Sequence, residues 1–146
     1  MLSGTFRAAR HPGVPRAPHL VGTLRIPGLA VVQDISFLVD TGADFTALFP
    51  ADGLAAGISY DALSPSTDAV GIGGTAQTFD EKAIVTFRNG STWYGYFITL
   101  KIFPPEREIS SLPSILGRDI LNRMVMHHAP STPRLEFEVV DADFVS

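Results

Sequence analysis

The chain has 146 residues, of which 45% are hydrophobic and 18% charged, and its formal net charge at pH 7 is −4. This composition indicates one globular domain with its own core and excludes a disordered chain. Without a basic stripe or a long apolar run, the sequence argues against a nucleic-acid partner and a membrane span. The absence of cysteine excludes disulfides and thiol chemistry and is compatible with the cytoplasm, where we expect the protein.

The first 18 residues differ in composition from the rest. They contain Pro12, Pro15 and Pro18 and several arginines, and they lack the apolar core of a secretory signal. This pattern predicts a flexible N-terminal arm over residues 1–18, followed by a single domain over residues 19–146.

Strands dominate the expected structure of the domain. Pro27-Gly28 and Asn89-Gly90 are typical of tight turns between strands. The stretch from Ala47 to Ile58 is rich in alanine, with Pro50 near its start and Gly57 at its end, which predicts a short helix. Strands are predicted at 20–26, 30–39, 79–87, 93–103, 114–117 and 135–139, and a second helix over 118–126.

The segment Phe37-Leu38-Val39-Asp40-Thr41-Gly42-Ala43 is the strongest indication of chemistry. An apolar strand here runs directly into an aspartate, a hydroxyl residue and a glycine. A carboxylate at the end of such a strand is costly unless it has a partner or a catalytic task. Asp-Thr-Gly occurs once in the chain, and Asp-Ser-Gly does not occur.

Three separated segments together resemble one family. The segment from Leu38 to Asp44, with Thr46, resembles the active-site loop of the retropepsins, a group of aspartic proteases. Val70-Gly71-Ile72-Gly73-Gly74 resembles the tip of the retropepsin flap, and Ile115 to Leu121 resembles the segment that opens the conserved helix of that family. The order and spacing also agree, over roughly residues 20 to 140.

The resemblance implies a mostly β, retropepsin-like closed barrel with one or two short helices, which forms a two-fold homodimer. Retropepsins need two aspartates side by side, so a second copy of the chain must supply the second Asp40. The two carboxylates share one proton, and one activates a water that attacks a peptide carbonyl. This chemistry implies a peptide or protein substrate, no metal and no cofactor.

The resemblance also implies roles for the residues around Asp40. Thr41 is expected to bond across the dimer to the opposite loop, and Gly42 to let the substrate backbone approach. Ala43 and Asp44 are expected to contact substrate. Asp44 is expected to pair with Arg118 in a buried or half-buried ion pair beneath the cleft.

In the same way, the glycine-rich segment is expected to act as a mobile lid. Gly71, Gly73 and Gly74 would let the tip bend over substrate, and Ile72 would pack on the substrate or on the flap of the partner. A phosphate-binding loop is disfavoured because the following segment is predicted to be a strand.

Other readings stay open at this stage. A retropepsin fold could bind peptides, or serve as a dimerisation module, without cutting anything. His127 and His128 are adjacent and lack a third ligand at metal-site spacing, so we expect surface histidines. Ser114 has no arrangement that would make it a nucleophile, and Asp119 is expected to be solvated or to interact with a helix dipole.

Overall fold

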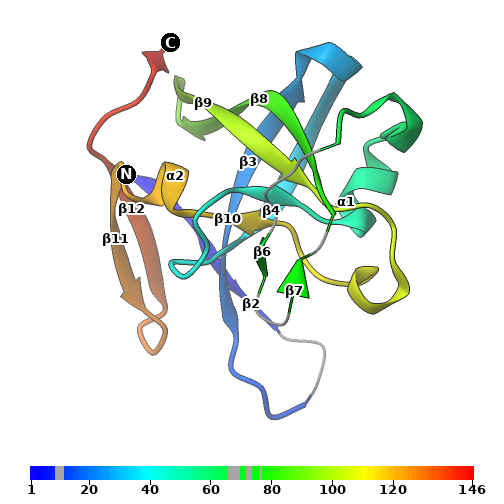
Figure 1. Ribbon diagram of the computed structural model, residues 1–146. Helices are drawn as coiled ribbons and strands as arrows, with labels where there is room; N and C mark the ends of the chain where they lie inside the picture. The colour runs from blue at the N-terminus through cyan, green and yellow to red at the C-terminus, as the bar shows by residue number, and fades with distance from the viewer. Residues whose placement is uncertain (9–11, 66–69, 72–73, 76) are drawn as a thin grey trace.

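Six strands close into a barrel (Figure 1). The structure is a computed structural model that describes residues 1–8, 12–65, 70–71, 74–75 and 77–146. Neighbouring barrel strands are antiparallel except for two parallel pairs, β4 with β10 and β5 with β9. In order around the barrel the strands are β3 (Ala17–Ile26), β4 (Val31–Val39), β10 (Ile115–Leu116), β5 (Ala47–Leu48), β9 (Thr92–Ile102) and β8 (Phe79–Asn89). The prediction of a mostly β, closed barrel is confirmed.

The barrel interior is filled by alternate side chains of its strands. On β4, Ile35, Phe37 and Val39 are buried, whereas Ser36 and Leu38 between them are only half buried. Successive side chains on a strand point to opposite faces, so β4 gives one face to the core and the other to the outside. Aromatic and aliphatic side chains of β8 and β9 complete this core.

The turns and helix ends lie at the proline and glycine residues of the sequence. Pro27–Leu29 forms a single 3-10 turn (η1) between β3 and β4. The helix α1 (Pro50–Ala55) begins with its proline, and Gly57 follows it with a φ of +76°. A left-handed φ of this kind favours glycine, which explains why the helix ends there. In the predicted hairpin, Asn89 pairs with Thr92, so the two-residue loop lies one position later than expected.

The N-terminal residues differ from the expected flexible arm. β1 (Leu2–Ser3) pairs with β12 (Arg134–Val139), and β2 (Thr5–Arg7) pairs with β3. Leu2 is only 2% exposed. The prolines lie in the connection after β2. The two short strands before this connection pair with the free edges of β12 and β3.

The predicted C-terminal helix is also shorter than expected. α2 (Arg118–Leu121) has a single turn, and the chain then continues as β11 (Met124–Ala129), which pairs with β12 along its whole length. Ile120, Leu121, Met124 and Val125 fit a helical spacing, but short apolar runs of this kind also fit a strand. Pairing with β12 decides in favour of the strand.

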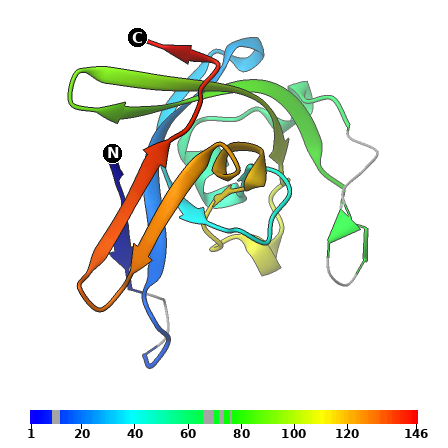
Figure 2. The ribbon, with the colours of Figure 1, turned by 90° about the vertical axis from the view of Figure 1, so that its left-hand side faces the viewer.

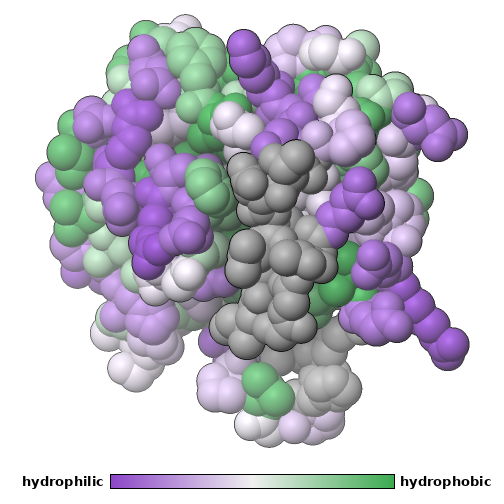
Figure 3. Space-filling model, in the orientation of Figure 1, coloured by the Kyte–Doolittle hydropathy of each residue, from purple (hydrophilic) through white to green (hydrophobic). Residues whose placement is uncertain are grey.

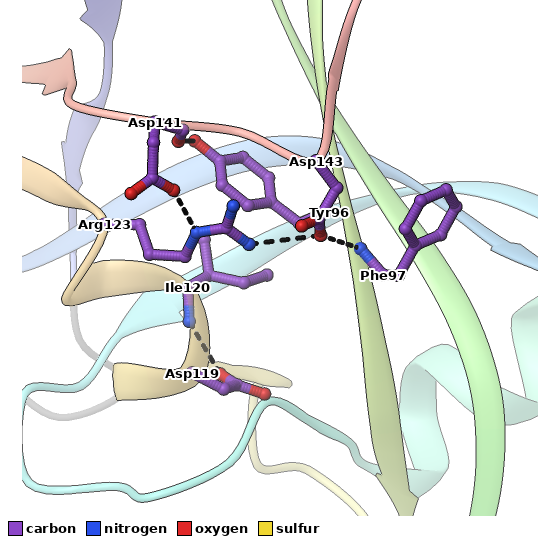
Figure 4. A network of polar contacts seen from close by, with 7 residues as sticks. All are labelled: Tyr96, Phe97, Asp119, Ile120, Arg123, Asp141 and Asp143. Carbon is purple, nitrogen blue, oxygen red and sulfur yellow. Dashed lines mark hydrogen bonds and ion pairs between the residues drawn. The ribbon is translucent and has the colours of Figure 1, made fainter.

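The C-terminal segment folds back onto the barrel, where β13 (Phe144–Val145) pairs with β9. Arg123 fastens it by ion pairs with Asp141 and, at 3.1 Å, Asp143 (Figure 4). The backbone N–H of Phe97 donates to Asp143 at 2.7 Å, and the Tyr96 hydroxyl donates to the Asp141 carbonyl at 3.0 Å. The hydrogen bond from Arg123 is the main cause that lowers the pKa of Asp143. Both chain ends are therefore paired within one copy.

The remaining elements are short. They are the 3-10 turns η2 (Tyr60–Ala62) and η3 (Arg107–Ile109) and a two-stranded ladder of β6 (Val70–Gly71) with β7 (Gly74–Thr75). In Figure 2 this ladder and the hairpin of β11 and β12 lie on opposite sides of the cyan loop that follows β4. The face shown in Figure 3 intersperses hydrophilic and hydrophobic residues around the grey atoms. Neither helix in the described part of the chain has the length and apolar character to cross a bilayer.

Candidate active site

Asp40 lies at the end of β4, between that strand and the exposed loop. Its backbone N–H donates to the carbonyl of Leu116 at 3.1 Å, and the N–H of Leu38 donates to that of Ser114 at 2.8 Å. The ladder between β4 and the β10 segment thus continues to Asp40, whose side chain is half buried. The rigid barrel therefore fixes the backbone from which the carboxylate projects.

The loop after Asp40 folds around its carboxylate. The N–H of Gly42 donates to Oδ1 of Asp40 at 2.9 Å, and the N–H of Ala43 donates to the Asp40 carbonyl at 3.2 Å. A Cβ on Gly42 would come within 3.3 Å of the same Oδ1, so a side chain at this position would crowd the carboxylate. Thr41 and Gly42 are exposed. The structure thus places the predicted residues Asp40 to Ala43 in one outward-facing turn.

A buried threonine anchors the far end of the loop. Thr46 is fully buried, and its N–H and Oγ1 donate to the two oxygens of Asp119 at 3.0 and 2.8 Å. The N–H of Gly117 donates to the same Oγ1 at 3.2 Å. Asp119 is half buried and joins the loop to α2, so it is not a solvated residue. Its Oδ1 also accepts from the N–H of Ile120 at 3.0 Å in the first turn of α2, which agrees with the other expectation, an interaction with the helix dipole. In the sequence Thr46 lies between the apolar residues Phe45 and Ala47. A hydroxyl residue in such a position could have indicated a buried side chain that needs a hydrogen-bond partner.

The loop and the start of α2 are in direct backbone contact. The N–H of Arg118 donates to the carbonyl of Ala43 at 2.8 Å. A Cβ on Gly117 would lie only 2.5 Å from the backbone carbon of Phe45, a distance that no side chain tolerates. Glycine is therefore required at position 117 for the loop to pack on α2.

Asp44 and Arg118 form the predicted ion pair within one copy of the chain, and Arg118 also approaches the carbonyl of Thr41 at 3.4 Å. Their side chains are 69% and 43% exposed in the single copy. The expectation of a buried or half-buried pair is thus not met in one chain, because both groups lie on the outer surface of the loop. Exposed pairs contribute little to stability, since water screens them and both side chains lose rotamer freedom.

This exposure sets the expected effect of Arg118→Ala. We expect the substitution to lower the free energy of unfolding of the monomer by about 0.2–1 kcal/mol, the range of exposed ion pairs. Urea titrations at low and high salt measure it, and salt should shrink the difference because it screens exposed charges. A loss above about 3 kcal/mol, typical of a broken buried pair, would contradict this assignment.

The glycine-rich segment forms part of a hairpin. Val70 pairs with Thr75 and Gly71 with Gly74 in an antiparallel ladder. Ile72 and Gly73, expected at its tip, lie outside the described residues. The mobility of this segment and its contact with substrate stay predictions.

The serine and the two histidines that were considered as possible functional residues lie away from the Asp40 loop in sequence, and each has its own surroundings. Oγ of Ser114 donates to Asp52 at 2.6 Å and accepts from the N–H of Phe49 at 3.0 Å, so this hydroxyl is engaged in holding α1. His127 and His128 lie on β11, one half buried and the other exposed. Among the described residues, no group of three or more potential ligands is placed to hold a metal ion.

Comparison with known proteins identifies the family of this chain. The family model described as "Aspartyl protease" matches residues 23–120, which is more than half of the chain and runs from within β3 into α2. The chain belongs to the aspartyl protease family. No curated protein matches its sequence.

Two solved structures are similar to this aspartyl protease. A retropepsin-like aspartic protease from Rickettsia conorii is similar with a TM-score of 0.50 and 18% identity, over 87% of this chain and 85% of that chain. The EIAV protease, solved with the inhibitor HBY-793, is similar with a TM-score of 0.46 and 19% identity, over 79% and 92% of the two chains. The first likeness supports a retropepsin-like fold.

Proposed function

We propose that the protein is a homodimeric aspartic endopeptidase in which Asp40 of each copy supplies one catalytic carboxylate. The observation that carries the proposal is the placement of the Asp-Thr-Gly turn. The barrel, Asp119 and Gly117 hold it rigidly, yet Thr41 and Gly42 remain exposed at its tip. A buried scaffold that presents a single carboxylate on an exposed turn fits a site completed by another molecule.

A second copy is the partner that the chemistry requires. An aspartic mechanism needs two carboxylates at hydrogen-bond distance, and the sequence contains the motif once. Two-fold symmetry would bring the same turn from each copy to the axis, where Asp40 meets its counterpart. In this arrangement Thr41 lies next to the axis and can bond to the opposite loop.

The reaction follows from the charge of the pair. Two carboxylates at hydrogen-bond distance cannot both ionise cheaply, so they hold one proton between them. The ionised member takes a proton from water, and the water oxygen attacks the peptide carbonyl. The protonated member gives its proton to the carbonyl oxygen, forming a tetrahedral intermediate. Collapse of this intermediate breaks the C–N bond as a proton passes to the leaving amine.

Gly42 and the loop backbone would assist in positioning. The hydrogen bond from the N–H of Gly42 orients one oxygen of Asp40. In the proposed dimer the other oxygen would face the axis or the substrate. Without a side chain at Gly42, an extended substrate backbone can approach the carboxylates. The β6–β7 hairpin is proposed as the lid that covers the bound peptide.

A shared site makes activity depend on concentration. We expect the cleavage rate per mole of chain to fall steeply on dilution below the dimer dissociation constant, because monomers carry half a site. Sedimentation or light scattering gives that constant, and a fluorogenic peptide gives the rate over the same range. A rate per chain that stays constant well below the dissociation constant would show that one copy is sufficient.

A further inference from the structure

An apolar row lies on the outside of the barrel, on the strands remote from Asp40. Ile84 on β8 pairs with Phe97 on β9 and, on its other side, with Arg25 on β3, so the three side chains stand next to one another. Phe97 is 61% exposed, and its ring points away from the buried ring of Tyr96 (Figure 4). The row therefore offers an aromatic and an aliphatic side chain to another molecule.

A hollow lies on each side of this row. The first has a volume of about 460 Å³ and is lined in part by Lys82, Ile84 and Phe97. The second has a volume of about 310 Å³ and is lined in part by Arg25, Ile84 and Phe144. We call the row and its two hollows the β8–β9 wall. Because both hollows share Ile84, a segment that crosses this residue can place one side chain in each.

The C-terminal segment of the chain shows which chemistry the wall accepts. β13 pairs with β9 beside the hairpin (Figure 2), and the ring of Phe144 covers Gly95, where an added Cβ would overlap that ring. The carboxylate of Asp143 accepts from the N–H of Phe97 at 2.7 Å, and the centroids of the Phe97 and Phe144 rings are 5.6 Å apart. An acidic residue followed by an aromatic one is thus already docked on β9, beside the first hollow.

The charged side chains that line the two hollows are cationic. Lys82 and Arg25 are exposed, and in the described part of the chain neither forms an ion pair. No described aspartate or glutamate lines either hollow, although the net charge of the chain is −4. The guanidinium of Arg88 lies 5.5 Å from the ring centroid of Trp93, which lines the second hollow. Carboxylates bound here would complement these cations.

We propose that the β8–β9 wall is a docking surface for a segment of another protein in which two bulky apolar side chains are flanked by carboxylates. The apolar side chains fill the hollows on either side of Ile84, one of them against the ring of Phe97, and the carboxylates lie near Lys82 and Arg25. Two separate hollows suit inserted side chains, which favours a protein segment over a flat membrane surface.

This surface is distinct from the candidate active site. Arg25 pairs with Val32, which is eight residues, or about 26 Å along an extended strand, from Asp40 on β4. The inference therefore goes beyond the proposed protease function and does not depend on it. It predicts a partner that is held away from the reacting atoms.

Fluorescence anisotropy of labelled synthetic peptides tests the proposal. The probes contain two phenylalanines, one to three residues apart, with glutamate at the other positions, and in matched peptides lysine replaces glutamate or alanine replaces phenylalanine. We expect the best glutamate peptide to bind with a Kd below about 1 mM and each replacement to weaken binding at least tenfold. Salt should also weaken binding, because the cations are exposed. All proteins carry Asp40→Asn, so that no peptide is cut during the measurement.

Two variants assign the binding to the wall. Phe97→Ala removes the exposed ring and should weaken binding at least about fivefold, whereas Leu54→Ala, which truncates an equally exposed side chain on α1, should leave the Kd unchanged. Lys82→Glu should weaken the glutamate peptide about fivefold and strengthen the lysine peptide by a similar factor, because it reverses the charge at the first hollow. Arg107→Glu, on the exposed part of η3, should do neither. Binding at the candidate active site would not respond to these substitutions.

Several results would overturn the proposal. One is the absence of any peptide with a Kd below that limit, and another is binding that both wall variants leave unchanged. If the protein instead sediments with phosphatidylserine vesicles, and Phe97→Ala and Lys82→Glu abolish this, the wall is a membrane surface. If Phe97→Ala dissociates an oligomer of the chain in sedimentation equilibrium, the occupant is a second copy. None of these measurements uses cleavage, so a failure of the docking surface and a failure of the protease function are seen separately.

Discussion

Replacing Asp40 with asparagine should abolish peptide cleavage while the protein stays folded and dimeric. An amide cannot take a proton from water, and in a homodimer one substitution removes both the base and the acid. General acid–base catalysis contributes about 10²–10⁴-fold, so we expect kcat to fall by about 10³-fold or more. The fold should tolerate the change, because the Gly42 N–H can still donate to the side-chain oxygen of asparagine.

The strand itself offers a matched control. Asp34 lies on β4 as well, is exposed, and accepts a hydrogen bond from Thr23 at 2.7 Å that the amide oxygen of asparagine can also accept. Asp34→Asn should therefore keep full activity and stability. Kinetics with a fluorogenic peptide, circular dichroism and sedimentation compare the two variants at the same concentration. Residual activity of Asp40→Asn within tenfold of wild type would end the aspartic mechanism.

The parts of the fold that were predicted correctly from the sequence are those that depend on residues close together in the chain. The apolar alternation of β4, Pro50 and Gly57 around α1, and the glycine at the β8–β9 turn each act through neighbouring residues. The roles of Asp40 to Asp44 came from the resemblance and stay predictions; the turn that these consecutive residues form is local. The ion pair with Arg118 came from the resemblance, and its exposure could not have been read from either segment alone.

The parts that were missed depend on contacts between distant segments. Leu2–Ser3 becomes a strand only because β12, more than a hundred residues later, presents an edge for it. Met124–Ala129 is a strand for the same reason, although its spacing also suits a helix. The bond between Thr46 and Asp119 joins positions 73 residues apart, so the acidic residue looked like an ordinary helix-start residue in the sequence.

Asp119 is therefore expected to matter for both stability and activity. Asp119→Ala would leave the N–H and the hydroxyl of fully buried Thr46 without their acceptors. A buried polar group without a partner costs about 1–3 kcal/mol, so we expect a loss of about 2–4 kcal/mol in the free energy of unfolding. Because this bond anchors the loop that carries Asp40, kcat should fall more than KM changes, even at temperatures where the variant is folded.

Comparison variants distinguish anchoring from a loss of charge. Asp119→Asn keeps one acceptor and should recover part of the stability, whereas Asp61→Ala, an exposed aspartate in the first turn of η2, should cost little. In the double variant with Thr46→Val, one orphaned donor is removed together with its acceptor, so its destabilisation should be smaller than the sum of the single effects. Denaturant unfolding and steady-state kinetics on the wild type, on Thr46→Val alone and on each of these variants measure these effects. If the two single effects add and the activity of folded Asp119→Ala equals that of wild type, then Asp119 does not hold the catalytic loop in place.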